Sequence, residues 1–207
     1  MNKPRINFTG WLCPGLLLLT IGPCANMLRA QEMTLELDPA NTRIEFTLAA
    51  TLHTVHGTFG LKRGTIYFNP STGSTGGLVI VDATSGDSGN KGRDHKMHQE
   101  ILESQRYPEI TFTTTKMSGR VELQGESEVQ VDGVFRLHGS EHPMTIPLLV
   151  QMKGNSLSAR THVSIPYITW GLKNPSTFVL HVSDKVNVDI TTKGRILSTQ
   201  APPTDGR

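Results

Sequence analysis

Two pairs of histidines are the residues of this chain whose types and spacing could support catalysis. His53 and His56 lie three residues apart beside a predicted turn, and His95 and His98 lie three apart in a stretch with a helical pattern, where Asp94 precedes His98 by one turn. Because residues i and i+4 are neighbours on a helix surface, Asp94 and His98 could share a proton or bind zinc with a third ligand. A His-dependent hydrolase or metal-dependent enzyme using His95, His98 and Asp94 is therefore one hypothesis.

The rest of the sequence supplies no partners for that chemistry. The chain contains no His-Glu-x-x-His zinc motif, no Gly-x-Ser-x-Gly nucleophile elbow and no phosphate-binding loop. Ser85, Ser88 and Ser104 have the sequence context of loop and capping residues rather than of nucleophiles. The sequence therefore favours a protein without catalytic residues, metal or cofactor.

Arg93 and Asp94 form a charged pair at the start of the predicted helix. Such a pair usually caps the helix and forms a surface ion pair, which contributes little stability. The alternative is that Arg93 points toward the mouth of a binding cavity and contacts the polar head of a ligand. The structural interpretation is favoured, and Arg93 is kept as a candidate ligand contact.

Alternation of apolar and polar residues dominates the remaining chain. From 43 to 52, Ile44, Phe46 and Leu48 fall on one face and polar residues on the other, and this period of two predicts a strand with one buried face. Glycines at 57, 60 and 64 then punctuate the pattern, which predicts two separate strands after the first. At least eight strands are expected in all, including 78–81, 110–114, 128–137, 144–152, 157–165 and 185–191.

These strands predict an all-β fold built from an antiparallel sheet that closes on itself. An open sheet of this length would leave its hydrogen-bonding edges exposed, so an eight-stranded barrel is favoured over the alternative of a two-sheet sandwich. The interior of such a barrel is filled by side chains or holds one small ligand. Because the inward set is rich in Phe, Leu, Ile and Val, a ligand there would be largely hydrocarbon.

One short helix interrupts the strands, within the stretch 92–112. Met97, Ile101 and Leu102 share a face of it, and Tyr107-Pro108 is expected to end it because the residue before proline disfavours helical backbone. We expect this helix to cover one end of the barrel. Ile168 to Leu172, an apolar segment between two predicted strands, is a second candidate for closing an end.

The first thirty residues predict a secretory signal peptide. Lys3 and Arg5 precede an apolar run too short to span a bilayer comfortably, and Ala30 offers a small residue for cleavage. Cleavage near Ala30 leaves a barrel domain at 31–197 and a disordered tail at 198–207. The mature protein is then expected in the periplasm or secreted, with no stable membrane span.

Charge and cysteine content narrow the classes of partner. The full chain has 20 Lys and Arg against 18 Asp and Glu, a net charge of +2 that becomes −1 without residues 1–30. Such a balance gives no sign of a nucleic-acid partner. Cys13 and Cys24 both lie in the predicted signal peptide, so no disulfide is expected in the exported domain. A lipoprotein signal cleaved before Cys24 is an alternative that Pro23 disfavours, and a homodimer is left open.

The sequence resembles the YceI-like family of polyisoprenoid-binding proteins over roughly residues 32–196. The resemblance rests on Leu37-Asp38, Ile44-Glu45-Phe46, His56-Gly57-Thr58-Phe59, Gly64-Thr65-Ile66, Arg93-Asp94, Tyr107-Pro108-Glu109-Ile110-Thr111-Phe112 and Val134-Phe135-Arg136-Leu137-His138-Gly139, followed by Pro143-Met144. It implies an extended lipocalin-like barrel whose apolar cavity takes an isoprenoid or similar lipid, in a protein commonly exported to the periplasm. The chain has Ile101-Leu102-Glu103 where many members have Phe-Phe-Asp.

The first hypothesis is thus a non-catalytic binding protein that carries or sequesters a hydrophobic chain, with a stress response as one setting. The expected ligand is an isoprenoid, an isoprenoid quinone or a fatty-acid-like chain. The candidate ligand-binding residues, in the cavity and at its mouth, are Phe46, Leu48, Phe59, Ile66, Phe68, Val81, Arg93, Met97, His98, Ile101, Leu102, Phe112, Phe135, Leu148 and Val163.

Overall fold

Nine antiparallel strands form a closed barrel in the computed structural model, which describes residues 32–70, 72–178 and 180–198. The strands are β1 (Met33–Leu37), β2 (Arg43–Ala49), β3 (Thr54–Phe68), β4 (Thr75–Asp87), β5 (Glu109–Gly119), β6 (Gly125–Leu137), β7 (Ser140–Lys153), β8 (Ser156–Ile165) and β9 (Val186–Ser198). The predicted signal peptide lies outside the described residues, as does the predicted tail beyond Ser198.

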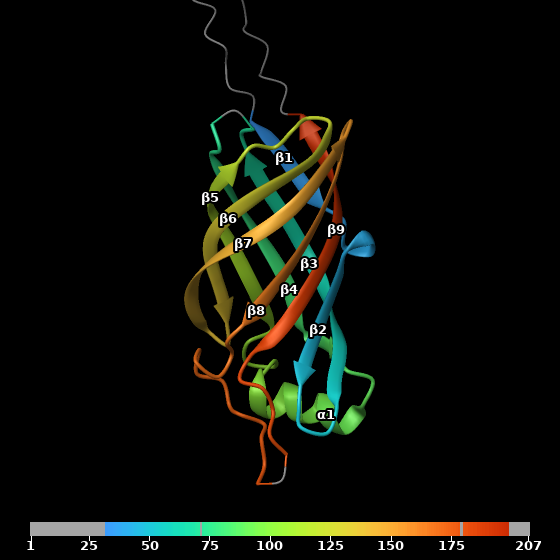
Figure 1. Ribbon diagram of the computed structural model, residues 1–207, viewed down its shortest axis with the longest axis vertical. Helices are drawn as coiled ribbons and strands as arrows, with labels where there is room; N and C mark the ends of the chain where they lie inside the picture. The colour runs from blue at the N-terminus through green and yellow to red at the C-terminus, as the bar shows by residue number, and fades with distance from the viewer. Residues whose placement is uncertain (1–31, 71, 179, 199–207) are drawn as a thin grey trace, which may run out of the picture.

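The nine strands occupy eight positions around the barrel. β1 and β2 both pair with β3 on one side and with β9 on the other, so they follow each other in one position. The short 3-10 turn η1 (Pro39–Asn41) separates them, and the Asp38 side chain caps it by accepting from the amide of Ala40 at 2.9 Å. β3 also pairs with β4, which closes the sheet and confirms the predicted eight-stranded antiparallel barrel (Figure 1).

β3 is a single strand of 15 residues, so the prediction of two strands was wrong. Gly60 and Gly64 lie within it near register shifts against β4 rather than in turns. A Cβ at Gly64 would lie 2.6 Å from Leu37 Cδ1 and 3.2 Å from Leu37 Cβ, so a larger residue there must displace the Leu37 side chain of β1. Glycine inside a strand often marks a close approach of another segment or a bulge. At such a position a glycine wrongly suggests a turn.

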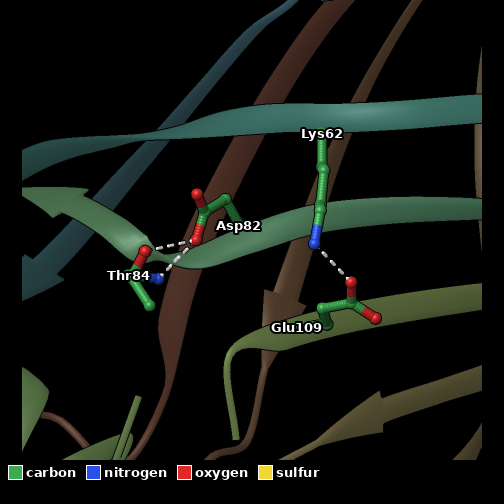
Figure 2. A network of polar contacts seen from close by, with 4 residues as sticks. All are labelled: Lys62, Asp82, Thr84 and Glu109. Atoms are coloured by element: carbon green, nitrogen blue, oxygen red, sulfur yellow. Dashed lines mark hydrogen bonds and ion pairs between the residues drawn. The ribbon is translucent and has the colours of Figure 1, made fainter. Parts of the chain in front are cut away.

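A capped bulge bends the end of β4. The Asp82 carboxylate accepts from the backbone amide of Thr84 at 2.8 Å and from its hydroxyl at 2.6 Å, and Lys62 Nζ pairs with Glu109 Oε1 at 2.7 Å across the same region (Figure 2). The hydrogen bond from the Thr84 side chain lowers the pKa of Asp82, against a smaller opposing effect of burial. The bulge places Ala83 to Gly86 of β4 between Asp82 and Asp87, whose partners Gly60 and Thr58 on β3 are separated by Phe59 alone.

The predicted covering helix is present and ends earlier than expected. α1 (Lys91–Lys96) is capped by Asn90, whose side-chain oxygen accepts from the amide of Arg93 at 3.0 Å, and it continues into the π-helical turn η2 (Met97–Ile101). Glu103 then adopts a left-handed backbone with φ of 45° and ends the helix. The expectation that Tyr107-Pro108 ends it was therefore wrong, because Pro108 instead precedes β5.

α1 lies across one end of the barrel, here called the helix end, and β1 lies at the other, the β1 end (Figure 1). The described residues between β8 and β9, 166–178 and 180–185, lie at the helix end as well, and they are called the loop below. None of the helices in the described ranges has the length and apolarity needed to cross a bilayer.

Candidate binding site

His98 holds the covering helix on the barrel. Its Nε2 lies 2.9 Å from the carbonyl oxygen of Gly86, and its Nδ1 lies 2.9 Å from the hydroxyl of Ser104. A carbonyl only accepts, so Nε2 donates to Gly86, and in the neutral ring Nδ1 then accepts from the Ser104 hydroxyl. Both ring nitrogens are therefore engaged in joining η2, β4 and the following turn, which gives His98 a structural role.

The other candidates for acid–base or metal chemistry do not meet His98 in one site. Asp94 accepts from the amide of Ser88 at 2.9 Å and from its hydroxyl. Burial opposes ionisation of this carboxyl, but the bonds from Ser88 and the charge of Arg93 outweigh it and lower the pKa of Asp94. His95 and His53 are exposed. Within the described ranges, no three His, Cys, Asp or Glu side chains are grouped to hold a metal ion.

Arg93 is engaged by the loop between β4 and α1. Its Nε donates to the hydroxyl of Ser88 at 2.8 Å, and its Nη2 donates to the Ser88 carbonyl at 2.9 Å. Asp94 is bound to the same serine, so both residues tie the start of the helix to Ser88, whereas the cap itself is Asn90 and not the predicted charged pair.

Inward-facing apolar side chains are buried at the β1 end and partly accessible at the helix end. Along β7, Met152 and Val150 are buried, whereas Leu148, Ile146 and Met144 keep part of their surface accessible. Inward residues that keep accessible surface also occur on β2, β6 and β9, at Leu48, Phe135, Val186, Val188 and Ile190, whereas Leu137, Val163 and Ile165 at the same end are buried. The interior is therefore closely packed near β1 and presents accessible apolar surface near the helix, in a region called the hollow below.

The barrel wall parts between β7 and β8 beside the hollow. The two strands pair only from Leu149 with Arg160 to Lys153 with Ser156, although β7 stays paired with β6 and β8 with β9 over their whole lengths. Figure 1 shows the two ribbons diverging toward the helix end. The unpaired stretch of wall is called the seam below.

Pro147 explains where the pairing stops. In an antiparallel pair, every second residue of a strand directs its N–H and C=O toward a given neighbour. The two-residue turn at 154–155 makes Lys153 the first residue of β7 that bonds to β8 in this way. Leu149 therefore bonds to β8 as well, and Pro147 is the next residue in the series. The carbonyl of Pro147 indeed faces β8, because it accepts from the hydroxyl of Thr161 at 2.5 Å. Pro147 has no N–H to donate to His162, its next partner in register, so the ladder ends there.

An open groove of about 820 Å³ crosses the wall from β5 to β9 at the level where the seam begins. Its lining includes Leu148 and Ile190, which belong to the inward faces of their strands, as well as the exposed pair His162 and Asp189. The groove therefore brings solvent to side chains of both faces of the wall, next to the accessible apolar surface of the hollow.

The helix end of the hollow is closed by side chains of two segments. Tyr167 and Leu172 from the loop are buried in one cluster that Ile101 and Leu102 from the helical turn pack against. The Tyr167 hydroxyl donates to the carbonyl of Ser183 at 2.7 Å, and burial, with the charge of Asp184, raises the pKa of Tyr167 to about 12. The apolar segment before Leu172 thus closes an end of the barrel, as its composition indicated.

The structure divides the predicted ligand-binding residues among three groups. Leu48, Ile101, Leu102 and Phe135 pack against the helix-end cluster that contains Val163. Phe68 and Phe112 belong to the packed cluster toward β1, against which Ile66 and, from the hollow, Leu148 pack. The third group lies around the end of β3 near the helix, where Phe46 and Phe59 contact each other with ring centroids 5.4 Å apart. The Phe59 ring and Met97 Cε both lie near Gly86. Val81, on β4, is partly buried.

Sequence reasoning did not select several residues of the hollow. These are Met144, Ile146, Ile168, Trp170, Val186 and Val188, together with His142. The strand residues among them continue the same apolar alternation as the residues that were selected, so the signal was present.

The chain matches the model of a known protein family and resembles several solved structures. Residues 35–193 match the family model of the YceI-like domain. None of the curated proteins matches. Among solved structures, BcnA of Burkholderia cenocepacia aligns with a TM-score of 0.63 at 16% identity, over 76% of this chain and 98% of that one.

Two further structures show the same fold. A polyisoprenoid binding domain from Saccharophagus degradans, implicated in plant cell wall breakdown, gives a TM-score of 0.59 at 16% identity, over 79% of this chain and 98% of that one. The YCEI protein of Campylobacter jejuni gives 0.50 at 16% identity, over 67% of this chain and 81% of that one.

Proposed function

The chain belongs to the YceI-like family, and we propose that it is a non-catalytic binding protein that holds a polyisoprenoid or similar long apolar chain inside its barrel. The observation that carries this proposal is the accessible apolar surface of the hollow, on inward residues such as Leu148, Ile146 and Met144. The polyisoprenoid binding domain of similar fold supports an isoprenoid as the ligand.

Burial of hydrocarbon supplies the affinity in this account. Each methylene group transferred from water to an apolar surface contributes about 0.8 kcal/mol, so a chain of a few isoprene units needs few polar contacts to bind. The apolar residues around the hollow are mainly Leu, Ile, Val, Met and aromatic side chains.

The seam supplies the route of entry in this proposal. The helix end is closed by the loop and the helical turn, and the β1 end is filled by buried side chains. The groove at the seam reaches Leu148 and Ile190 from outside. A flexible chain therefore enters through the side of the barrel, between β7 and β8.

Export is part of the proposed function. The positive start, the apolar run and Ala30 in the first thirty residues support a signal peptide. A barrel that shields an apolar chain from water suits a periplasmic or secreted protein that sequesters or carries such a chain.

The proposal is tested on protein expressed from the full sequence. Native mass spectrometry of the purified protein, followed by organic extraction and analysis of the extract, is expected to show one long-chain lipid per barrel. Delipidated protein is expected to take up an isoprenoid alcohol from solution in the same ratio. Protein that is isolated empty and takes up no isoprenoid, alcohol or fatty acid would contradict the proposal.

A further inference from the structure

One polar side chain stands among the apolar residues of the hollow. His142 has the same inward phase along β7 as Met144 and Ile146, and it is partly buried. Its Nε2 atom is buried and has no hydrogen-bond partner in the described part of the chain. A buried polar atom without a partner is costly, so such an atom beside a binding cavity calls for an explanation.

Aromatic packing holds the His142 ring in place. Trp170 stacks on it with ring centroids 4.1 Å apart and an angle of 2° between the planes. Trp170 also contacts Phe135, the cross-strand partner of His142, at 5.5 Å between centroids. The imidazole therefore keeps one orientation at the helix end of the hollow, as a site that recognises a ligand requires.

Within the described ranges, two other buried side-chain polar atoms lack a hydrogen bond, and each has a different setting. Thr114 is buried on β5, beyond Phe112 toward the packed β1 end. His138 Nε2 lies 3.4 Å from the carboxylate of Glu103, which gives it a charged neighbour. His142 alone of the three combines an unpartnered atom with a place beside the accessible apolar surface.

On the basis of the proposed function, we propose that His142 binds the oxygen atom of a neutral head group, a hydroxyl or a carbonyl, at the end of the apolar chain. The chain then lies along Met144, Ile146 and Leu148 with its head toward Trp170. A neutral oxygen fits because it supplies the missing hydrogen bond without burying an unpaired charge beside the Trp170 ring. An imidazole nitrogen either donates to a carbonyl or exchanges a hydrogen bond with a hydroxyl, so both head groups suit it.

The test compares ligands with one chain and different heads. Geranylgeraniol, the same hydrocarbon without its hydroxyl, and geranylgeranyl phosphate are titrated into delipidated protein expressed from the full sequence. The wild type is expected to bind the alcohol about tenfold more tightly than the hydrocarbon, the change that one hydrogen bond to a buried group typically confers. The phosphate is expected to bind no more tightly than the alcohol.

Variants assign the preference to His142. His142→Leu is expected to lose the tenfold preference while binding the hydrocarbon within about twofold of the wild type, and His142→Gln, which keeps a polar group at similar reach, is expected to retain part of it. His53→Leu is the matched control, since His53 is exposed and lies outside the hollow and the seam. Circular dichroism of each variant checks that it is folded.

The outcomes separate this inference from the proposed function. Equal binding of alcohol and hydrocarbon by the wild type, an unchanged preference in folded His142→Leu, or tighter binding of the phosphate overturns the head-group assignment and leaves the proposed function in place. A wild type that binds none of the three ligands overturns the proposed function, and this inference with it.

Discussion

Replacing Pro147 by Val is expected to close the seam. The substitution restores an N–H at the position where the β7–β8 ladder ends, opposite His162 in register. Two backbone hydrogen bonds then become possible between these residues, and each contributes about 1 kcal/mol. Loss of the proline costs roughly 0.4–1 kcal/mol through the greater freedom of the unfolded chain. The free energy of unfolding should therefore rise by about 1 kcal/mol.

Ligand exchange should change more than stability. If a chain enters through the seam, the two added bonds must break first, and about 2 kcal/mol corresponds to roughly thirtyfold slower association. Dissociation slows by the same factor, so the equilibrium affinity stays constant. Stopped-flow fluorescence of Trp170, which lies at the hollow, measures both rates, and hydrogen exchange at His162 reports whether the new pair has formed.

Pro143→Val is the matched control for this prediction. It restores an N–H on the same edge of β7, but Pro147 still stops the ladder before it reaches that position, so the exchange rates should not change. A protected amide at His162 in Pro147→Val with an unchanged association rate would refute entry through the seam. An unprotected amide at His162 would refute the account of why the two strands part.

Three further substitutions test how the barrel and its cover are held. His98→Ala should lower the free energy of unfolding in urea titrations by roughly 1–3 kcal/mol, because it removes two hydrogen bonds and leaves their buried partners unsatisfied. His95 is exposed, so His95→Ala should change the free energy of unfolding little. Equal effects of the two substitutions would contradict the structural role of His98. The pKa of Asp82 is lowered in the folded state from its usual value of 3.8, so the ionised carboxylate stabilises the fold fully above pH 3.8, and this stabilisation is lost as the pH falls through the folded-state pKa. Asp82→Ala should therefore weaken the dependence of stability on acid pH. An unchanged pH profile would count against the hydrogen bonds from Thr84 to Asp82. Gly64→Ala should destabilise the barrel by roughly 1–3 kcal/mol, because the added methyl group clashes with Leu37 of β1. Gly76→Ala is the control, since its added methyl group meets no atom within 4 Å. Similar melting temperatures for the two variants would argue against the close approach of Leu37 to Gly64.

The strands and the closure of the barrel could be predicted because they depend on local alternation. Ile44, Phe46 and Leu48 show the buried face of β2 directly in their spacing. The errors came from residues whose effect depends on distant parts of the chain. Gly64 resembles a turn residue but meets β1, and the left-handed backbone of Glu103, which ends the helix, has no marker in its residue type.

The candidate site could be predicted only in its chemistry. Apolar inward residues were recognised, yet Met144 and Met152 have the same type and the same phase on one strand, while only the second is buried. The difference between them depends on how the wall parts at Pro147 and on which segments fill each end. The unpartnered nitrogen of His142 likewise depends on its neighbours in space.

The methyl groups of the methionines offer the most direct test of the central claim, that an apolar chain occupies the helix-end hollow. In protein labelled with carbon-13 at the methionine methyls, titration with geranylgeraniol should shift the resonance of Met144 and give contacts between its methyl and the ligand. Met117 and Met152, buried in the packed cluster toward β1, should be unaffected. Shifts at Met117 and Met152 with none at Met144, or no shift at any methionine at saturating ligand, would contradict the account.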